Sequence, residues 1–209
     1  MNRRILIAAA ACTAVAPGLV QAAVPADSQA GVGRPAPAFE VIDSSMRKRT
    51  LAEFKGKTVV LEWSSPSCPF AKAQYVSGRV PKLQTWAERQ GVIWLTVLSS
   101  HPSRSDYLEP DKAEAFNRGR GGVPSALLID ASGVLGRAYG AKTANHMFIV
   151  GKDGTLVYAG GIDDGETMNP QEVLAAHNHV QAALEDIVAG KVVHVATTRP
   201  FGCALAYAG

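Results

Sequence analysis

Cys68 is followed at once by a proline, and this pair ends an apolar run rich in β-branched residues. Proline is well tolerated as the first residue of a helix, because its missing N–H would be unpaired there. The sequence therefore predicts that Cys68 is the N-cap of a helix that directly follows a strand. Backbone donors and the positive helix end would then face its sulfur, and Lys72 would add a positive charge one turn along. This setting lowers a thiol pKa from about 8.5 towards neutrality and so produces a nucleophilic thiolate; the alternative is a buried cysteine acting as a small hydrophobic residue.

A second cysteine, Cys203, lies near the carboxyl end of the chain. In one interpretation, Cys68 attacks an oxidant or a disulfide, and Cys203 resolves the resulting sulfenic acid or mixed disulfide. In the other, the two form a permanent disulfide that pins the tail and stabilises the fold by about 4–5 kcal/mol. We favour the first. A different class of function is a Cu(I)-binding or delivery module, for which Cys68, Cys203 and His146 supply suitable ligands. No other metal and no cofactor is expected.

The first 22 residues have the layout of a secretory signal peptide. Arg3 and Arg4 are followed by an apolar stretch over residues 5–16 and by the small-residue site Val20-Gln21-Ala22. Cleavage would leave a periplasmic or secreted protein in a compartment that permits disulfides.

The remaining chain has the size of one domain with a substantial core, since 47% of all 209 residues are hydrophobic. Removing residues 1–22 leaves 19 basic against 18 acidic residues, so charge gives no case for a nucleic acid or membrane-surface partner. No other segment is apolar enough to span a bilayer. We expect a linker over residues 23–32, a domain over 33–190 and a tail over 191–209 that carries Cys203.

Strands and helices alternate along the domain, and a hairpin comes late. The central strand, residues 58–63, is apolar on both faces apart from Glu62, which is typical of a sheet covered by helices. The helix after Cys68 should break near Ser77-Gly78. Further strands are expected at residues 92–98 and 126–130, a helix near 111–117, a hairpin at 147–159 around Asp153-Gly154, and one last helix from Pro170 to Gly190. A central mixed sheet between helices is the simplest architecture.

Three polar stretches are interpreted as surface features. Residues 118–122 (Arg-Gly-Arg-Gly-Gly) are expected to form a flexible loop. Residues 163–166 (Asp-Asp-Gly-Glu) resemble a fragment of a calcium loop but lack the other ligand positions, so a solvated turn is expected. His177 and His179 are two apart on the last helix, which places them on different faces as exposed residues.

Several motifs in order along the chain resemble the redoxin family (peroxiredoxin-like, alkyl hydroperoxide reductase/thiol-specific antioxidant). They are Gly33-Arg34-Pro35-Ala36-Pro37-Ala38-Phe39, Leu51 to Leu61, Ser65-Pro66-Ser67-Cys68-Pro69-Phe70, Tyr139-Gly140-Ala141, His146 to Val150, Gly154 to Gly160 and Pro200-Phe201-Gly202-Cys203. The resemblance implies a thioredoxin-like fold, a three-layer α/β/α sandwich with a central mixed sheet. It also implies a thiol-dependent peroxidase or thiol–disulfide oxidoreductase that acts on a peroxide or a protein disulfide and is reduced by a thiol partner.

The resemblance also implies roles around Cys68. Ser65 would hydrogen-bond the sulfur, or would only end the strand. His146 would lie on the loop facing Cys68, as general base or orienting group, or as a structural histidine.

Three departures from the family pattern limit these roles. Ala71 replaces the second cysteine of a Cys-x-x-Cys motif, Leu61 replaces the peroxiredoxin pocket proline, and Asn145 replaces the cis-proline before the next strand. A cis bond before a non-proline residue costs about 3 kcal/mol, so a trans bond and a different loop shape are predicted.

Overall fold

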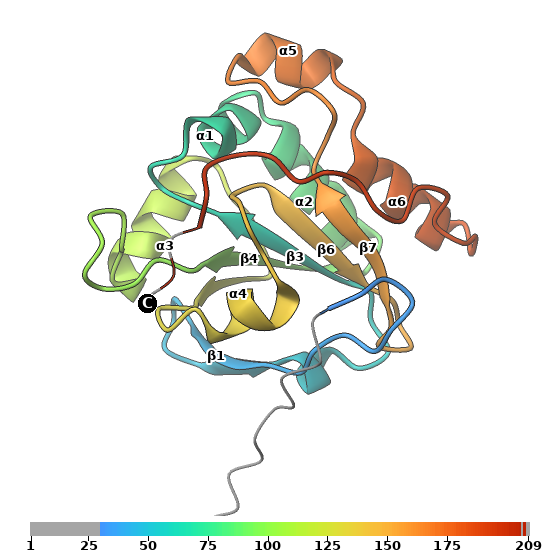
Figure 1. Cartoon of the computed structure of the whole chain (residues 1–209), viewed down its shortest axis with the longest axis horizontal. Helices are drawn as coiled ribbons and strands as arrows, with labels where there is room; N and C mark the ends of the chain where they lie inside the picture. Colours follow the sequence, from blue (N-terminus) through green and yellow to red (C-terminus); the bar gives the residue numbers. More distant parts are fainter. Residues whose placement is uncertain (1–29, 206, 208–209) are drawn as a thin grey trace, which may run out of the picture.

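The computed structural model describes residues 30–205 and 207. The predicted signal peptide and most of the predicted linker lie outside the described residues. The described chain forms a seven-stranded mixed sheet with helices on both faces (Figure 1). Its strands are β1 (Glu40–Asp43), β2 (Lys48–Thr50), β3 (Val59–Ser64), β4 (Ile93–Leu98), β5 (Ala126–Ile129), β6 (His146–Val150) and β7 (Leu156–Gly161). Its helices are η1 (Leu51–Phe54), α1 (Pro69–Val76), α2 (Arg79–Arg89), α3 (Pro110–Gly119), α4 (Val134–Tyr139), α5 (Pro170–Ala175) and α6 (His179–Val188).

The strand that delivers Cys68 lies inside the sheet, whose order is β2-β1-β5-β4-β3-β6-β7. Strand β3 runs parallel to β4, with Leu61 opposite Leu95, and antiparallel to β6, with Leu61 opposite Phe148. All six residues of β3 are buried, as expected for a strand covered on both faces. Strands β1 and β2 pair as an antiparallel hairpin at one edge of the sheet.

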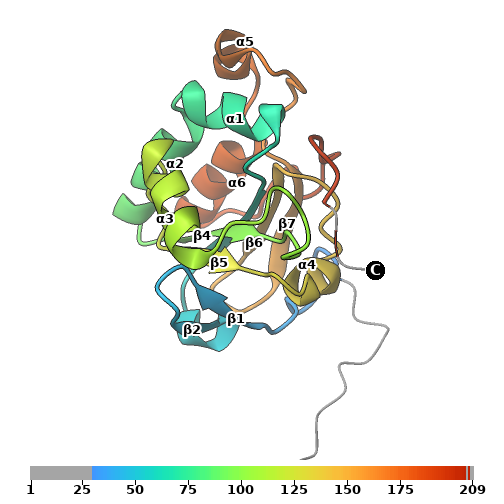
Figure 2. The same ribbon diagram turned by 90° about the vertical axis from the view of Figure 1, so that its left-hand side faces the viewer.

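Helices cover both faces of the sheet and so create two main cores. One core packs α1, α2 and α6 against one face of the sheet, with Trp94 and Tyr158 among its largest side chains. The other packs η1 and α4 against the opposite face, around Trp63, Tyr139 and Phe148. Figure 2 shows α2 and α3 on one side of the sheet and α4 on the other. The predicted three-layer α/β/α sandwich with a central mixed sheet is confirmed.

Two differences from the predicted elements concern helices. The expected single helix from Pro170 to Gly190 is two helices, α5 and α6, because Ala176 leaves the helical backbone and Asn178 caps a new start. The apolar period continues across this break, so periodicity alone did not reveal it. Helix α4 was not predicted; a buried carboxylate, Asp130, accepts hydrogen bonds from the backbone N–H groups of Leu135 and Gly136 at its start.

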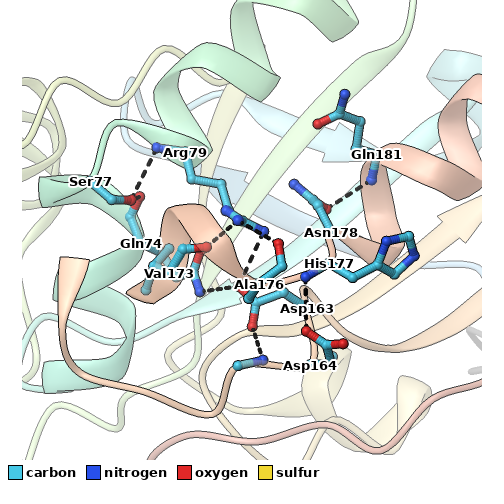
Figure 3. A network of polar contacts seen from close by, with 12 residues as sticks. Gln74, Ser77, Arg79, Asp163, Asp164, Val173, Ala176, His177, Asn178 and Gln181 are labelled. Carbon is cyan, nitrogen blue, oxygen red and sulfur yellow. Dashed lines mark hydrogen bonds and ion pairs between the residues drawn. The ribbon is translucent and has the colours of Figure 1, made fainter. Parts of the chain in front are cut away.

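A buried polar network ties α5 to the main body of the domain (Figure 3). Arg79 donates to the backbone carbonyls of Val173 and Ala176 and lies 3.5 Å from the carboxylate of Asp163. Gln74 Nε2 donates to the same carboxylate over 2.7 Å. We call these five residues the Arg79 network. Asp163 is buried, so the prediction of a solvated turn at residues 163–166 is wrong for its first residue.

The carboxyl-terminal tail returns from α6 along the edge of the sheet (Figure 1). Ala159 N–H donates to Ala196 O, and Thr198 N–H donates to Ala159 O. The hydroxyl of Thr198 also accepts from Gly161 N–H. The tail is therefore held against β7 before it reaches Cys203.

Candidate functional site

Cys68 lies between the central strand and its helix, as the sequence predicts. Strand β3 ends at Ser64, Cys68 is the N-cap of α1, and Pro69 is the first helical residue. The side chain of Cys68 packs against Phe70, Ala71 and Ala144, and the residue is only 1% exposed. The strand-to-helix junction thus holds the sulfur beneath the surface.

Cys68 and Cys203, the two cysteines of the described part of the chain, form a disulfide with a Cα–Cα distance of 5.7 Å. The backbone holds the tail in place around this bond. Ala144 N–H donates to Cys203 O over 2.8 Å, and Thr143 pairs with Ala204 in a short bridge. We call the disulfide and this backbone pairing the disulfide clasp.

Gly202 is required for the clasp because of its conformation and its close approach to the loop before β6. Its φ is +124°, and a Cβ at this position would overlap the carbonyl oxygen of Ala144. In the same stretch of the tail, Phe201 is buried and its ring packs edge-on against Phe70, with centroids 6.1 Å apart. The tail therefore approaches Cys68 through packing and backbone bonds as well as through sulfur.

One hydrogen bond to the Cys68 sulfur is present, and its donor is unexpected. The backbone N–H of Cys203 lies 3.2 Å from Cys68 Sγ. The side chain of Cys68 accepts no capping bond from α1. In the disulfide form, the amide of Cys203 therefore takes the place of the helix amides that were predicted to face the Cys68 sulfur. The positive end of the helix dipole still points at this position.

Ser65 is buried beside the clasp, but its hydroxyl bonds elsewhere. It donates to Asp106 Oδ2 over 3.2 Å and lies 3.3 Å from the Ser67 hydroxyl, which also bonds to Asp106. The backbone carbonyl of Ser65 accepts from Cys68 N–H. Asp106 comes from the loop after β4, and no sequence pattern indicated that it would meet this turn.

His146 is the first residue of β6 and is buried next to the loop that contacts the clasp. Its Nδ1 accepts a hydrogen bond from Lys142 N–H, and its ring lies 4.3 Å from that of Phe148. Burial and then the nearby Lys142 charge lower the pKa of His146 to about 4. The imidazole is therefore neutral at pH 7. The two contacts account for a structural histidine, while a direct role at the sulfur remains a prediction.

The loop before β6 has the shape expected from the loss of proline. No peptide bond among residues 30–205 is cis, so the predicted trans bond at Asn145 is confirmed. Asn145 has φ +65°, and its N–H donates to Trp63 O over 2.8 Å. This bond anchors the loop to β3 and places Ala144 against both Cys68 and Cys203.

Lys72 is exposed on α1 and borders a cleft of about 480 Å³ that Ser65 and Pro66 also line. Arg120 also lines this cleft: its guanidinium lies 3.6 Å from the ring centre of Tyr75 and donates to Ser64 Oγ over 2.8 Å. The prediction of a flexible loop at residues 118–122 is wrong here. Arg118 and Gly119 belong to α3, and Arg120 is fixed by stacking.

Below this turn, a buried carboxylate is surrounded by donors. Glu62 on β3 accepts hydrogen bonds from Tyr75, Gln84, Trp94 and Thr96. Burial, and next the Glu62 charge, raise the pKa of Tyr75 well above its usual value, so its hydroxyl remains a donor. The sequence marked Glu62 only as the polar residue of an apolar strand.

The ligand set proposed for copper is not assembled as a metal site. In residues 30–205 and 207, no group of three or more histidine, cysteine or acidic side chains is placed to hold a metal ion. Both sulfurs are engaged in the disulfide. Within the same residues, no helix combines the length and apolarity needed to cross a membrane.

Comparison with known proteins bears on both the fold and the family. Residues 32–159, more than half of the chain, match the model of the AhpC/TSA family. No curated protein is similar enough to the chain to count as a relative.

Solved structures share the fold. A hypothetical protein from Sinorhizobium meliloti 1021 is 24% identical with a TM-score of 0.71, and the match covers 86% of this chain and 96% of that one. An uncharacterized conserved protein from Geobacillus kaustophilus is 20% identical with a TM-score of 0.71, over 85% and 93% of the two chains. A protein from Chlorobium tepidum, provisionally named thiol:disulfide interchange protein DsbE, is 17% identical with a TM-score of 0.54, over 70% and 98%.

Proposed function

Since the chain belongs to the AhpC/TSA family and has a thioredoxin-like fold, we propose that it is an exported thiol–disulfide oxidoreductase whose exchangeable bond is Cys68–Cys203. The observation that carries this proposal is the disulfide itself, formed across 135 residues with Cys68 at the start of α1. Because residue 71 is alanine, an oxidised Cys68 has no thiol partner on its own helix, and Cys203 takes that place. The substrate class is a protein or small-molecule dithiol or disulfide.

The position of Cys68 supports exchange because it favours a thiolate as leaving group. The positive end of α1 and the N–H of Cys203 both stabilise negative charge on this sulfur. A disulfide with a stabilised leaving thiolate is more easily reduced than one that only joins two segments. The name of the Chlorobium tepidum structure, an interchange protein, agrees with this chemistry.

Peroxide reduction is the second candidate, because it ends in the same disulfide. The polar groups around Cys68 favour peroxide reduction less than they favour disulfide exchange. The hydroxyls of Ser65 and Ser67 are directed at Asp106, and an apolar residue, Leu61, stands where the peroxiredoxin pocket has proline. We rank exchange first for this reason.

Export is part of the proposal. It rests on the signal-peptide layout of residues 1–22 and on the disulfide, which persists in oxidising compartments. We propose a periplasmic or secreted mature protein, and sequencing its amino terminus should recover Ala23 or a neighbouring residue. Recovery of Met1 on protein isolated from the cytosol would contradict export.

The test of activity is a redox titration of the folded protein in dithiothreitol and glutathione buffers, with thiols counted after alkylation. We expect reversible reduction of one disulfide at a potential above about −300 mV, the range of labile rather than structural bonds. Cys68→Ser and Cys203→Ser should each abolish the two-electron couple. A disulfide that is reduced only when the protein unfolds would refute the proposal.

A parallel assay separates the two candidates. Reduced wild-type protein is mixed with hydrogen peroxide, and thiol loss is followed over time. If exchange is the main activity, the protein thiols should react with hydrogen peroxide at a rate close to that of an ordinary thiolate. A rate several orders of magnitude higher would favour the peroxidase.

A further inference from the structure

The two cysteine residues of the clasp differ in their exposure to solvent. Cys68 is 1% exposed and is covered by Phe70, Ala71 and Ala144. Cys203 is partly exposed, and Ala204 beside it is exposed with only a methyl side chain. A molecule that approaches the disulfide from solvent therefore meets Cys203.

Thiol–disulfide exchange requires a thiolate to attack one sulfur directly, so access decides which sulfur receives it. Resting on the proposed function, we infer that Cys203 is the sulfur attacked by the incoming thiolate and the one that carries the mixed disulfide with the partner. Cys68 is then the buried leaving group. This reverses the order expected from sequence, in which Cys68 forms the mixed disulfide and Cys203 resolves it.

The step balances as a two-electron exchange. A bond forms between the partner sulfur and Cys203 Sγ, the Cys68–Cys203 bond breaks, and its electron pair remains on Cys68 as a thiolate. A second thiolate of the partner then attacks the partner sulfur of the mixed disulfide and releases Cys203 as a thiolate. The partner dithiol has become a disulfide, and the clasp has become two thiols.

The surroundings of Cys68 suit a leaving thiolate. It lies at the positive end of α1, and the N–H of Cys203 already donates to its sulfur over 3.2 Å. That amide stays in place during the exchange if the tail stays docked. Backbone bonds hold the tail on both sides of the sulfur: Ala144 N–H to Cys203 O over 2.8 Å, and Leu205 N–H to Lys142 O over 2.9 Å.

The test maps the mixed disulfide on the oxidised wild-type protein. The protein is mixed with excess 2-mercaptoethanol, quenched with acid at short times, alkylated with N-ethylmaleimide and digested for mass spectrometry. We expect the mercaptoethanol adduct on Cys203 and the maleimide on Cys68, in a ratio of roughly ten to one or more. An adduct mainly on Cys68, or equally on both, would overturn the inference and leave the proposed function intact. Failure of the folded protein to react at all would overturn both.

A steric variant gives a second readout that does not depend on trapping the adduct. Ala204→Trp places a large side chain beside Cys203, and we expect it to slow reduction of the clasp by dithiothreitol roughly tenfold. Ala175→Trp, at an exposed site on α5, is the matched control and should reduce at the wild-type rate. Equal rates for Ala204→Trp and wild type, with both folded by circular dichroism, would contradict attack at Cys203.

Discussion

The disulfide clasp and the Arg79 network both tie the carboxyl-terminal part of the chain to the region of α1, by different means. In the network, Arg79 at the start of α2 donates to two backbone carbonyls at the end of α5 and pairs with the buried carboxylate of Asp163 (Figure 3). The clasp joins the tail to the start of α1 through one disulfide, with backbone pairing between the tail and the loop before β6. A buried ion pair breaks only at high cost, whereas a disulfide is made and broken by exchange at the sulfurs. Under the proposed function, the network is therefore the permanent attachment and the clasp the reversible one.

The largest expected effect separates stability from activity at the network. Asp163→Asn removes the charge that faces the buried guanidinium of Arg79, and we expect it to lower the free energy of unfolding by about 3–5 kcal/mol. At temperatures where the variant is folded, its disulfide exchange rate should match that of wild type. Urea unfolding under oxidising conditions measures the first quantity.

Asp164→Asn is the control for this variant, because Asp164 is exposed and accepts one backbone hydrogen bond from His177. It should cost less than about 1 kcal/mol. Similar losses of unfolding free energy for both variants would show that the buried ion pair stabilises the fold no more than an exposed carboxylate does.

The region beside the clasp should respond to acid through His146. The unfolded state protonates this imidazole below about pH 6.5, whereas the folded state does so only below about pH 4. The contribution of His146 to the free energy of unfolding is therefore fully present above pH 6.5, and it is lost as the pH drops towards 4. The shift corresponds to about 3 kcal/mol, so His146→Gln should flatten the acid branch of the stability curve by that order.

The measurement is urea unfolding at intervals between pH 7 and pH 4. His194→Gln, at an exposed position on the tail, serves as the control and should follow the wild-type curve. An acid branch that is unchanged in His146→Gln would mean that other groups cause the acid sensitivity.

A smaller effect is expected from the glycine that lets the tail approach Ala144. Gly202→Ala places a Cβ against the Ala144 carbonyl at a φ of +124°, and should destabilise the oxidised protein by about 2 kcal/mol. The control, Gly190→Ala, also has a positive φ, but a Cβ there meets no atom within 4 Å. It should cost about 1 kcal/mol. Equal costs in denaturant unfolding would mean that the close approach at Gly202 relaxes freely.

The smallest expected effect concerns Ser65. Its hydroxyl is bonded to Asp106, so Ser65→Ala should change the rate of clasp reduction by less than about threefold, within the net contribution of one hydrogen bond. Stopped-flow reduction by dithiothreitol measures this rate. A loss of tenfold or more would restore the predicted role of Ser65 at the sulfur.

The sequence by itself determined the local features of this protein. The apolar residues on both sides of Glu62 predicted β3, and the proline after Cys68 predicted the N-cap of α1. The Asp153-Gly154 turn predicted the β6–β7 hairpin. Each of these signals acts within a few residues. The absence of a second cysteine near Cys68 likewise directed attention to Cys203.

Only the tertiary structure decided what these features meet. The disulfide joins positions 135 apart, Asp106 reaches Ser65 across 41 residues, and Arg79 meets Val173 across 94. Such contacts depend on how strands and helices pack together, and no local propensity or period encodes them. The same reason explains the different exposure of Cys68 and Cys203: packing buries Cys68 and leaves Cys203 partly exposed.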